Sequence, residues 1–277
     1  MLKRCRPLLG TFVEISADRE DAIDAAFEAI AQVHRLMSAH EPGSDVSRIN
    51  RLAHQRPVEV DDWTARVLER ALYWATQSGG AFDPVRAGKG ALARGAIPRH
   101  RDQPQPEASH WTWLELQGRS AQLLKPGCID LGGIAKGFAI DRAIEALHRD
   151  GCAQGLVNAG GDMRGFGAHS APVTVVEPRQ RRPLAVVDLL NSALATSGGL
   201  PDDQGRLTFE HLGGTNPRWS SVTVVAATAC DADALTKILW AAGEDAGRLL
   251  DAAGAKALAI NHDGEVEAVF EVAEEHA

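Results

Sequence analysis

The segment IDLGGIAKG, residues 129–137, decides how the middle of this chain folds. An apolar strand end leads into Asp130, two glycines follow, and Lys136 opens a helix that we expect to run from Ile134 to about His148. A helix N-terminus offers free N–H donors and a partial positive charge, and glycine lets a ligand approach the backbone. The segment therefore predicts a phosphate site or, with equal weight, a tight strand-to-helix turn. Its spacing does not fit the G-x-x-x-x-G-K-[ST] order of a P-loop.

Outward from this segment, short strand patterns and longer helical patterns follow one another in both directions. No repeat and no Pro- or Ser-rich linker divides the chain, so we expect an α+β or mixed α/β fold in a single domain, 1–277. We expect helices over 18–39, from 61 or 62 to 79, over 134–148 and 232–242, and through 250. Residues 86–108 show no clear period and are expected to be irregular. Strands are expected at 8–16, 111–116, 120–125, 129–131, 156–158, 173–176, 184–190, 222–227, 257–260 and 266–270.

Composition and charge exclude several classes of protein. With 44% hydrophobic residues and 24% charged residues, the chain is neither disordered, collagen-like nor a coiled coil. The net charge of −8 and the absence of a concentrated basic stretch argue against a nucleic-acid binder. A polyanionic ligand would thus need local cations or a metal. Four cysteines lie far apart and predict neither a disulfide scaffold nor a zinc site.

The expected location follows from the absence of two signals. Uninterrupted apolar stretches are far shorter than the ~20 residues of a membrane helix. The basic N-terminus lacks an apolar export segment, which predicts a cytoplasmic protein. A chain trimmed of its signal, including a periplasmic, membrane-associated form, would look the same.

Three further groups of residues are candidates for chemistry. NAGGDMRG (158–165) is a glycine turn after a strand, and we interpret it as a turn or bulge because no helix follows. Asp233, Thr236 and Lys237 share one side of a helix. The Asp233 carboxylate and the Thr236 hydroxyl could hold a hard cation such as Mg²⁺, but an N-cap aspartate with an ion pair to Lys237 is the favoured interpretation. His211 stands before a glycine loop, where a general base is plausible, although a single histidine favours no role by itself.

Taken together, these segments resemble the ApbE family, the FAD:protein FMN transferases. The ordered blocks are RPLLGTFVEIS (6–16), MSAHEPGSDVSRIN (37–50), SGGAFDP (78–84), IDLGGIAKGFAIDRAIEAL (129–147), LVNAGGDMRGFG (156–167), ALATSGG (193–199) and SVTVVAATACDADALT (221–236). The resemblance implies a mixed α/β, T-fold-like flavin transferase fold, with mixed sheets flanked by helices. It also implies FAD as substrate, Mg²⁺ on the FAD pyrophosphate, and an acceptor protein with a Thr or Ser flavinylation site.

The same resemblance implies roles for individual residues. The flavin nucleotide would contact Asp130 and Lys136, and Leu9 and His40 match positions that line the flavin site. The metal ligands would be the backbone of Gly133, the carboxylate of Asp233 and the hydroxyl of Thr236, which would also face the nucleotide. The base that takes the acceptor's proton would be His211 or Asp233.

Three departures from the family pattern bear on the activity. The position four residues after the metal aspartate, where the family commonly has threonine or a similar oxygen, is Lys237. Either Thr236 substitutes, or the charge of Lys237 partly replaces that of the metal. The segment after His211 reads GGTNPR (213–218), without the family's aspartate, and ARGA (93–96) replaces a W-G-F-G-like element. A metal-dependent FAD pyrophosphatase and a non-catalytic FAD-binding protein therefore remain alternatives to the transferase.

Overall fold

The computed structural model describes residues 1–93, 95–98, 109–202, 204, 206–209, 212, 216 and 218–270. The chain divides into two compact units. Unit 1 comprises residues 1–30 and 136–277, and unit 2 comprises residues 31–135. Helix α1 (Glu20–Met37) begins in unit 1 and continues into unit 2. The single domain expected from the sequence stays a prediction.

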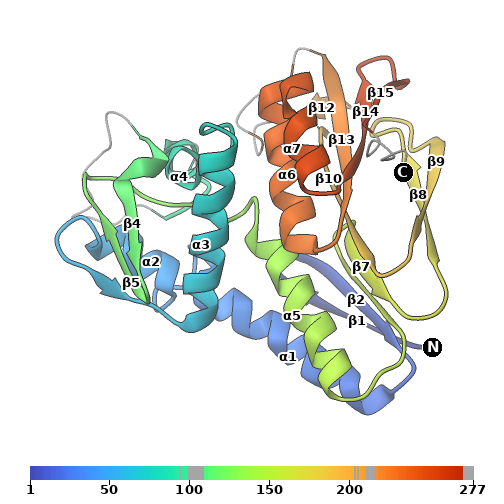
Figure 1. Ribbon diagram of the computed structural model, residues 1–277, viewed down its shortest axis with the longest axis horizontal. Helices are drawn as coiled ribbons and strands as arrows, with labels where there is room; N and C mark the ends of the chain where they lie inside the picture. The colour runs from blue at the N-terminus through green and yellow to red at the C-terminus, as the bar shows by residue number, and fades with distance from the viewer. Residues whose placement is uncertain are drawn as a thin grey trace, which may run out of the picture. The chain divides into compact units, whose positions relative to one another are not determined.

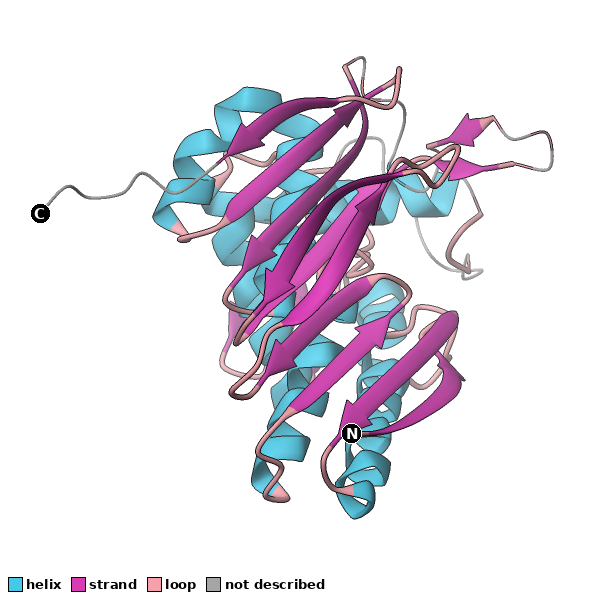
Figure 2. Ribbon diagram, turned by 90° about the vertical axis from the view of Figure 1, so that its right-hand side faces the viewer, coloured by secondary structure: helices cyan, strands magenta, loops and turns pink. Residues whose placement is uncertain are grey.

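Unit 1 is built on an eight-stranded sheet with the order β1-β2-β6-β7-β10-β13-β14-β15. Figure 2 shows strands of this sheet side by side. Every neighbouring pair in it is antiparallel. The α+β character expected from the sequence is confirmed. Helices flank the sheet, and the sheet itself does not combine parallel and antiparallel strands. The strands are β1 (Leu2–Leu8), β2 (Thr11–Ala17), β6 (Gly155–Ala159), β7 (Asp162–Phe166), β10 (Ser192–Gly198), β13 (Trp219–Ala226), β14 (Lys256–Asn261) and β15 (Val266–Phe270).

Helices pack on this sheet and bury its core (Figure 1). Helix α6 (Ala229–Ala242) lies against β10 and β13, and α7 (Gly247–Ala252) lies against β14. Helix α5 (Ala135–Arg149) contacts β6, where the side chain of Leu147 meets Gly155. Two hairpins, β8 (Ala171–Val176) with β9 (Pro183–Leu189) and β11 (Leu200–Pro201) with β12 (Leu207–Thr208), and a 3-10 turn, Gly243–Ala246, complete the described part of unit 1.

The first strand pair corrects the prediction of one strand over 8–16. The chain reverses at Leu9 and Gly10, which both have positive φ (55° and 71°), so that Leu8 pairs with Thr11. This is the backbone shape of the two-residue turns that join antiparallel strands. Leucine rarely adopts this conformation, and the sequence signal for a turn was therefore the single Gly10.

Unit 2 is a smaller α+β assembly. Its three-stranded sheet has the order β3-β5-β4, with β3 (Val58–Glu59), β5 (Ser120–Leu123) and β4 (Leu114–Gln117). Its helices are α2 (Asp45–Leu52), α3 (Asp62–Gln77) and α4 (Pro84–Ala93), with a 3-10 turn at Trp111–Trp113. Asp61 caps α3 by accepting a hydrogen bond from the Trp63 N–H, which confirms the predicted start of that helix.

Two expectations for unit 2 are wrong. Residues 86–93, part of the stretch 86–108 expected to be irregular, belong to α4, in which a Cβ on Gly88 would lie 2.3 Å from the Cys128 carbonyl oxygen. Gly88, one of the two glycines that weakened the helical signal, is thus needed for close packing. Residues 129–131 are not a strand: the Asn50 side chain donates to the Ile129 carbonyl and accepts from its N–H, at 3.0 and 2.7 Å. In the described part of the chain, no helix is both long and apolar enough to cross a membrane.

Candidate functional site

The first turns of α5 and α6 cross within unit 1 and define the candidate site. A Cβ on Gly137 would lie 2.1 Å from the Ala229 carbonyl oxygen, so only glycine permits this approach. Asp141, one turn further along α5, accepts hydrogen bonds from the N–H groups of Ala229 and Cys230, both at 2.9 Å. Arg164 on β7 pairs with the same carboxylate. Burial raises the pKa of Asp141, while Arg164 and the two N–H donors oppose that shift.

Asp233 connects the two helices from the second turn of α6. Its side chain is fully buried. Oxygen Oδ2 accepts a hydrogen bond from the Gly137 N–H at 3.2 Å, and Oδ1 lies 2.8 Å from the Lys237 ammonium. The carboxylate thus faces the positive end of the α5 dipole on one side and an ammonium on the other, which is the pairing that a buried charge requires.

Lys136 and Asp162 form a second ion pair beside the first. The Lys136 Nζ lies 2.8 Å from Asp162 Oδ2, as a close ion pair rather than a well-aligned hydrogen bond. Asp162 Oδ1 accepts from the Thr196 N–H at 3.1 Å. Burial raises the pKa of Asp162, with a further increase from Asp233, while Lys136 and Lys237 oppose it. Burial acts to lower the pKa of Lys136, but Asp162 and Asp233 outweigh it and the net direction is upward.

Lys237 uses all three of its N–H donors within the cluster. Besides Asp233, its Nζ donates to Ser197 Oγ at 2.8 Å and to Thr236 Oγ1 at 3.0 Å. The Thr236 hydroxyl donates to the Asp233 backbone carbonyl at 2.7 Å. The Ser197 hydroxyl therefore donates to Thr236 Oγ1, also 2.7 Å away. The Thr236 oxygen then gives one hydrogen bond and accepts two, which is the full capacity of a hydroxyl.

This arrangement does not fit the magnesium ion that the resemblance implies at Asp233 and Thr236. Mg²⁺ needs oxygen ligands at about 2.1 Å in near-octahedral geometry and keeps several waters. Here the Lys237 ammonium already sits among the Asp233, Ser197 and Thr236 oxygens, and Thr236 has no free lone pair. Among the described residues, no group of three or more His, Cys, Asp or Glu side chains is placed to hold a metal.

Leu9 lies at the same end of the sheet's strands as Asp162. The turn between β6 and β7 contains Gly160 with φ 64°, and a Cβ there would lie 2.7 Å from Thr11 Oγ1, just past the β1–β2 turn. The Gly160 N–H donates to the Phe12 carbonyl. The turn that carries half-buried Leu9 is thereby held beside the turn that leads into Asp162.

Three predicted site residues belong to unit 2. Asp130 accepts a hydrogen bond from the Gly132 N–H at 2.8 Å, so its carboxylate shapes the glycine turn that includes Gly133. His40 is exposed in the turn after α1, and its N–H donates to Ser38 Oγ. The structure thus places Lys136, Asp233 and Thr236 in one cluster of unit 1, whereas Asp130, Gly133 and His40 belong to unit 2. His211 lies outside the described residues.

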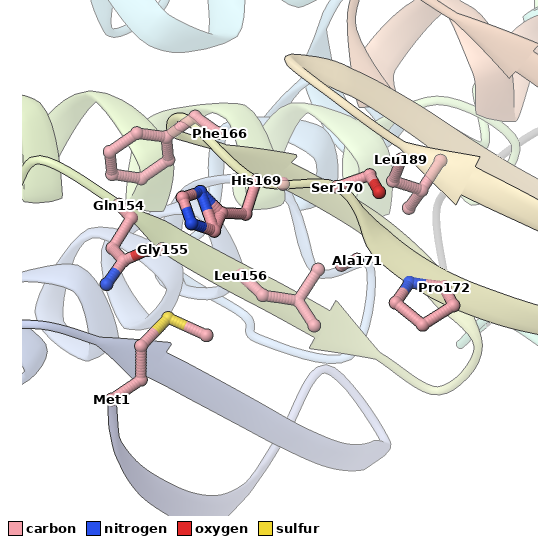
Figure 3. Close-up of a pocket in the computed structure, with 11 residues that line it drawn as sticks. Met1, Gln154, Gly155, Leu156, Phe166, His169, Ser170, Ala171, Pro172 and Leu189 are labelled. Carbon is pink, nitrogen blue, oxygen red and sulfur yellow. The ribbon is translucent and has the colours of Figure 1, made fainter.

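A pocket elsewhere in unit 1 shares no residue with this cluster (Figure 3). Its volume is about 240 Å³. The lining is mostly apolar, and its titratable side chain is His169. It comes from Met1 and from residues of the β6–β7 and β8–β9 hairpins and their flanks, such as Leu156, Phe166 and Pro172.

Two members of the cluster were not singled out as site residues from the sequence. Asp162 belongs to the quoted GGD block, and Ser197 to the ALATSGG block. Both side chains are buried, at 2% and 4% exposure. Their polar character within strands that are otherwise largely buried was the signal that could have identified them.

Comparison with known proteins assigns the family. The ApbE family model matches residues 9–269. An FAD:protein FMN transferase of Rhodobacter capsulatus is 30% identical over 96% of this chain, which spans 56% of that protein. The solved ApbE protein of Thermotoga maritima superimposes with a TM-score of 0.81 and 26% identity, covering 96% of each chain. The Vibrio cholerae flavin transferase ApbE has a TM-score of 0.82 at 21% identity, covering 98% of this chain and 97% of that one.

These matches extend over nearly the whole chain and define a class, the flavin-transferase-like α+β proteins. The chain belongs to the ApbE family.

Proposed function

We propose that this protein is an FAD:protein FMN transferase, which moves FMN from FAD to a Thr or Ser hydroxyl of an acceptor protein and releases AMP. The curated relative of Rhodobacter capsulatus carries that name, and the family model covers residues 9–269. The observation that carries the proposal is the position of Lys136, an ammonium on the first turn of α5. Among the described residues, Asp162 is its one carboxylate within ion-pair distance.

Lys136 and the α5 N-terminus supply positive charge for the FAD pyrophosphate. An ammonium has three donors, and the ion pair to Asp162 leaves donors free for phosphate oxygens. The helix dipole adds a partial positive charge at the same place. Charge that builds on the phosphoryl oxygens during transfer would be stabilised by donors already in position.

The proposed reaction forms one bond and breaks one. The acceptor oxygen attacks the phosphorus on the flavin side, forming the new P–O bond as the bridging P–O bond breaks, and AMP leaves with that oxygen. The hydroxyl proton passes to a base. Both carboxylate oxygens of Asp233 are engaged, by the Gly137 N–H and by Lys237, so the base of the proposal is His211.

The family resemblance implies magnesium dependence, and the oxygens at Asp233 and Thr236 do not support it. A bound Mg²⁺ would neutralise pyrophosphate charge. The described oxygens at Asp233 and Thr236 are already taken by Lys237, so no step of the proposed reaction passes through the metal.

The proposal is tested by incubating the purified protein with FAD, with and without a candidate acceptor. Products are analysed by intact-mass spectrometry and nucleotide chromatography. An acceptor heavier by one FMN, with an equal amount of AMP, supports the transferase. FMN and AMP without labelling of a competent acceptor would support an FAD pyrophosphatase. Intact FAD throughout, with FAD bound to the protein, would support a non-catalytic flavin-binding protein.

A further inference from the structure

The ammonium of Lys237 occupies a position among oxygens that resembles a cation site. Its three donors reach the Asp233 carboxylate, the Ser197 hydroxyl and the Thr236 hydroxyl, at distances between 2.8 and 3.0 Å. Asp233 and Thr236 are fully buried, and Ser197 is 4% exposed. The lysine side chain is itself only 26% exposed. The oxygens therefore have little access to solvent, and the ammonium is what satisfies them.

Charge counting in the cluster supports the same conclusion. Asp162 and Asp233 contribute two negative charges, and Lys136 and Lys237 contribute two positive charges. The cluster is therefore neutral as it stands. A divalent cation placed at Asp233 would lie within a few ångströms of the Lys237 ammonium, and the repulsion between them would add to the cost of dehydrating the ion. With a hydroxyl in place of the ammonium, the cluster would carry a net charge of −1 and attract a cation.

We propose that the Lys237 ammonium is a built-in cation that takes the place of a divalent metal ion at Asp233, Ser197 and Thr236. The consequence for the flavin nucleotide rests on the proposed function: FAD binding by this protein does not require a divalent metal. Lys237 is a positioning residue here, because it holds Asp233 against the Gly137 N–H and so fixes the first turn of α5 beside Lys136.

The first experiment measures metal binding without FAD. The purified full chain is titrated with Mn²⁺ and free Mn²⁺ is followed by electron paramagnetic resonance, because Mn²⁺ uses the oxygen ligands that Mg²⁺ uses. The native protein is expected to bind no stoichiometric Mn²⁺. Lys237→Thr should create a site at least ~10-fold tighter than any in the native protein, since it removes the ammonium and adds a hydroxyl. Lys256→Thr, at an exposed position on β14, is the matched control and should behave as the native protein.

The same titration can overturn the proposal without relying on a variant. One Mn²⁺ bound per native chain, lost in Asp233→Asn, would show that the ammonium does not exclude a metal. If Lys237→Thr does not fold by circular dichroism, Lys237→Gln replaces it, because its amide removes the charge and offers an oxygen. Failure of a folded charge-removing variant to bind Mn²⁺ would also contradict the proposal.

The second experiment measures FAD affinity by fluorescence quenching, in EDTA and in Mg²⁺. The native protein should bind FAD with the same affinity, within about twofold, in both conditions, whereas Lys237→Thr should bind more tightly in Mg²⁺. FAD binding by the native protein that EDTA abolishes would overturn the proposal. If no variant binds FAD in either condition, the proposed function fails, while the Mn²⁺ titration still decides whether Lys237 replaces the metal.

Discussion

Lys136 and Lys237 are two ammonium groups in one cluster, and they differ in how much of their bonding capacity the protein uses. Lys237 comes from α6 and donates to three oxygens, including that of Asp233 one turn earlier. Lys136 comes from the first turn of α5 and forms a close ion pair with Asp162 on β7. Lys237, whose three donors are all used, stabilises the crossing of α5 and α6. Lys136 has donors to spare and is therefore the ammonium available to a ligand. Position on a helix therefore says less about role than the acceptors that surround the side chain.

The largest expected effect is that of removing the charge that holds Lys237. Asp233→Asn keeps the shape but leaves the ammonium without its carboxylate and weakens acceptance from the Gly137 N–H. Breaking a buried ion pair by neutralising one partner should cost about 3–5 kcal/mol in free energy of unfolding. Urea denaturation measures it, with Asp251→Asn, an exposed aspartate on α7, as control. A native-like midpoint would show that Lys237 does not need the carboxylate.

The approach of α5 to α6 is expected to rank second. Gly137→Ala places a methyl group 2.1 Å from the Ala229 carbonyl oxygen, so the two helices must separate. This separation changes the positions of Lys136 and Lys237 relative to each other. Overpacking of this kind should lower the free energy of unfolding by about 2–3 kcal/mol. Gly43→Ala, where the added Cβ meets no atom within 4 Å, is the control. Equal stability of the two variants would contradict the rigid crossing.

Lys136→Met tests the lysine with spare donors and should act on both stability and ligand affinity. The side chain is 31% exposed, so losing the pair should cost about 2 kcal/mol near pH 7, between the values for surface and buried pairs. FAD affinity by titration calorimetry should fall at least ~10-fold with the loss of a charge-assisted contact. Unchanged affinity would remove Lys136 from the phosphate site.

The pH dependence of that variant follows from Asp162. Burial, with Asp233, already raises the Asp162 pKa, and removing Lys136 raises it further. A protonated carboxyl needs no counter-charge, so the stability deficit of Lys136→Met should shrink as pH falls from neutral into the acid range. At the basic end, the raised pKa of Lys136 keeps its contribution intact below the ordinary value of 10.5, and it is lost as pH rises above that value. Denaturation curves across pH measure both trends. A stability deficit of Lys136→Met that is the same at every pH would exclude the interaction between the charges of Lys136 and Asp162.

The smallest expected effect is that of Ser197→Ala, which frees one donor of Lys237. The hydroxyl accepts from Lys237 and contacts Thr236, so its loss should cost about 1 kcal/mol. The variant makes Lys237 more like Lys136, with a donor to spare. Thermal unfolding measures the change, with Ser170→Ala at an exposed position as control. A loss as large as that of Asp233→Asn would mean that the hydroxyl and the carboxylate hold Lys237 equally.

Local patterns predicted the elements whose signals lie within a few residues. Asp61 caps α3 as its position indicated, and the helix after the glycine turn runs from Ala135 to Arg149, within a residue of the predicted bounds. Local sequence patterns led to wrong predictions where contacts with residues distant in the sequence decide the backbone conformation. Helix α4 tolerates Gly88 because the Cys128 backbone lies against it, and the Ile129 backbone pairs with the Asn50 side chain instead of a strand.

The candidate site shows the same division. The ApbE resemblance, the glycine turn before Lys136 and the helical spacing that lets Lys237 reach Asp233 could all be predicted, since they depend on neighbours along the chain or on ordered motifs. The contacts that β7 makes possible between Asp162 and Lys136, and β10 between Ser197 and Lys237, could not be predicted in this way, because they depend on the folded arrangement of the strands. Those contacts join residues 26 and 40 positions apart, and sheet order, which is set by packing of the whole core, decides which strands lie beside each helix.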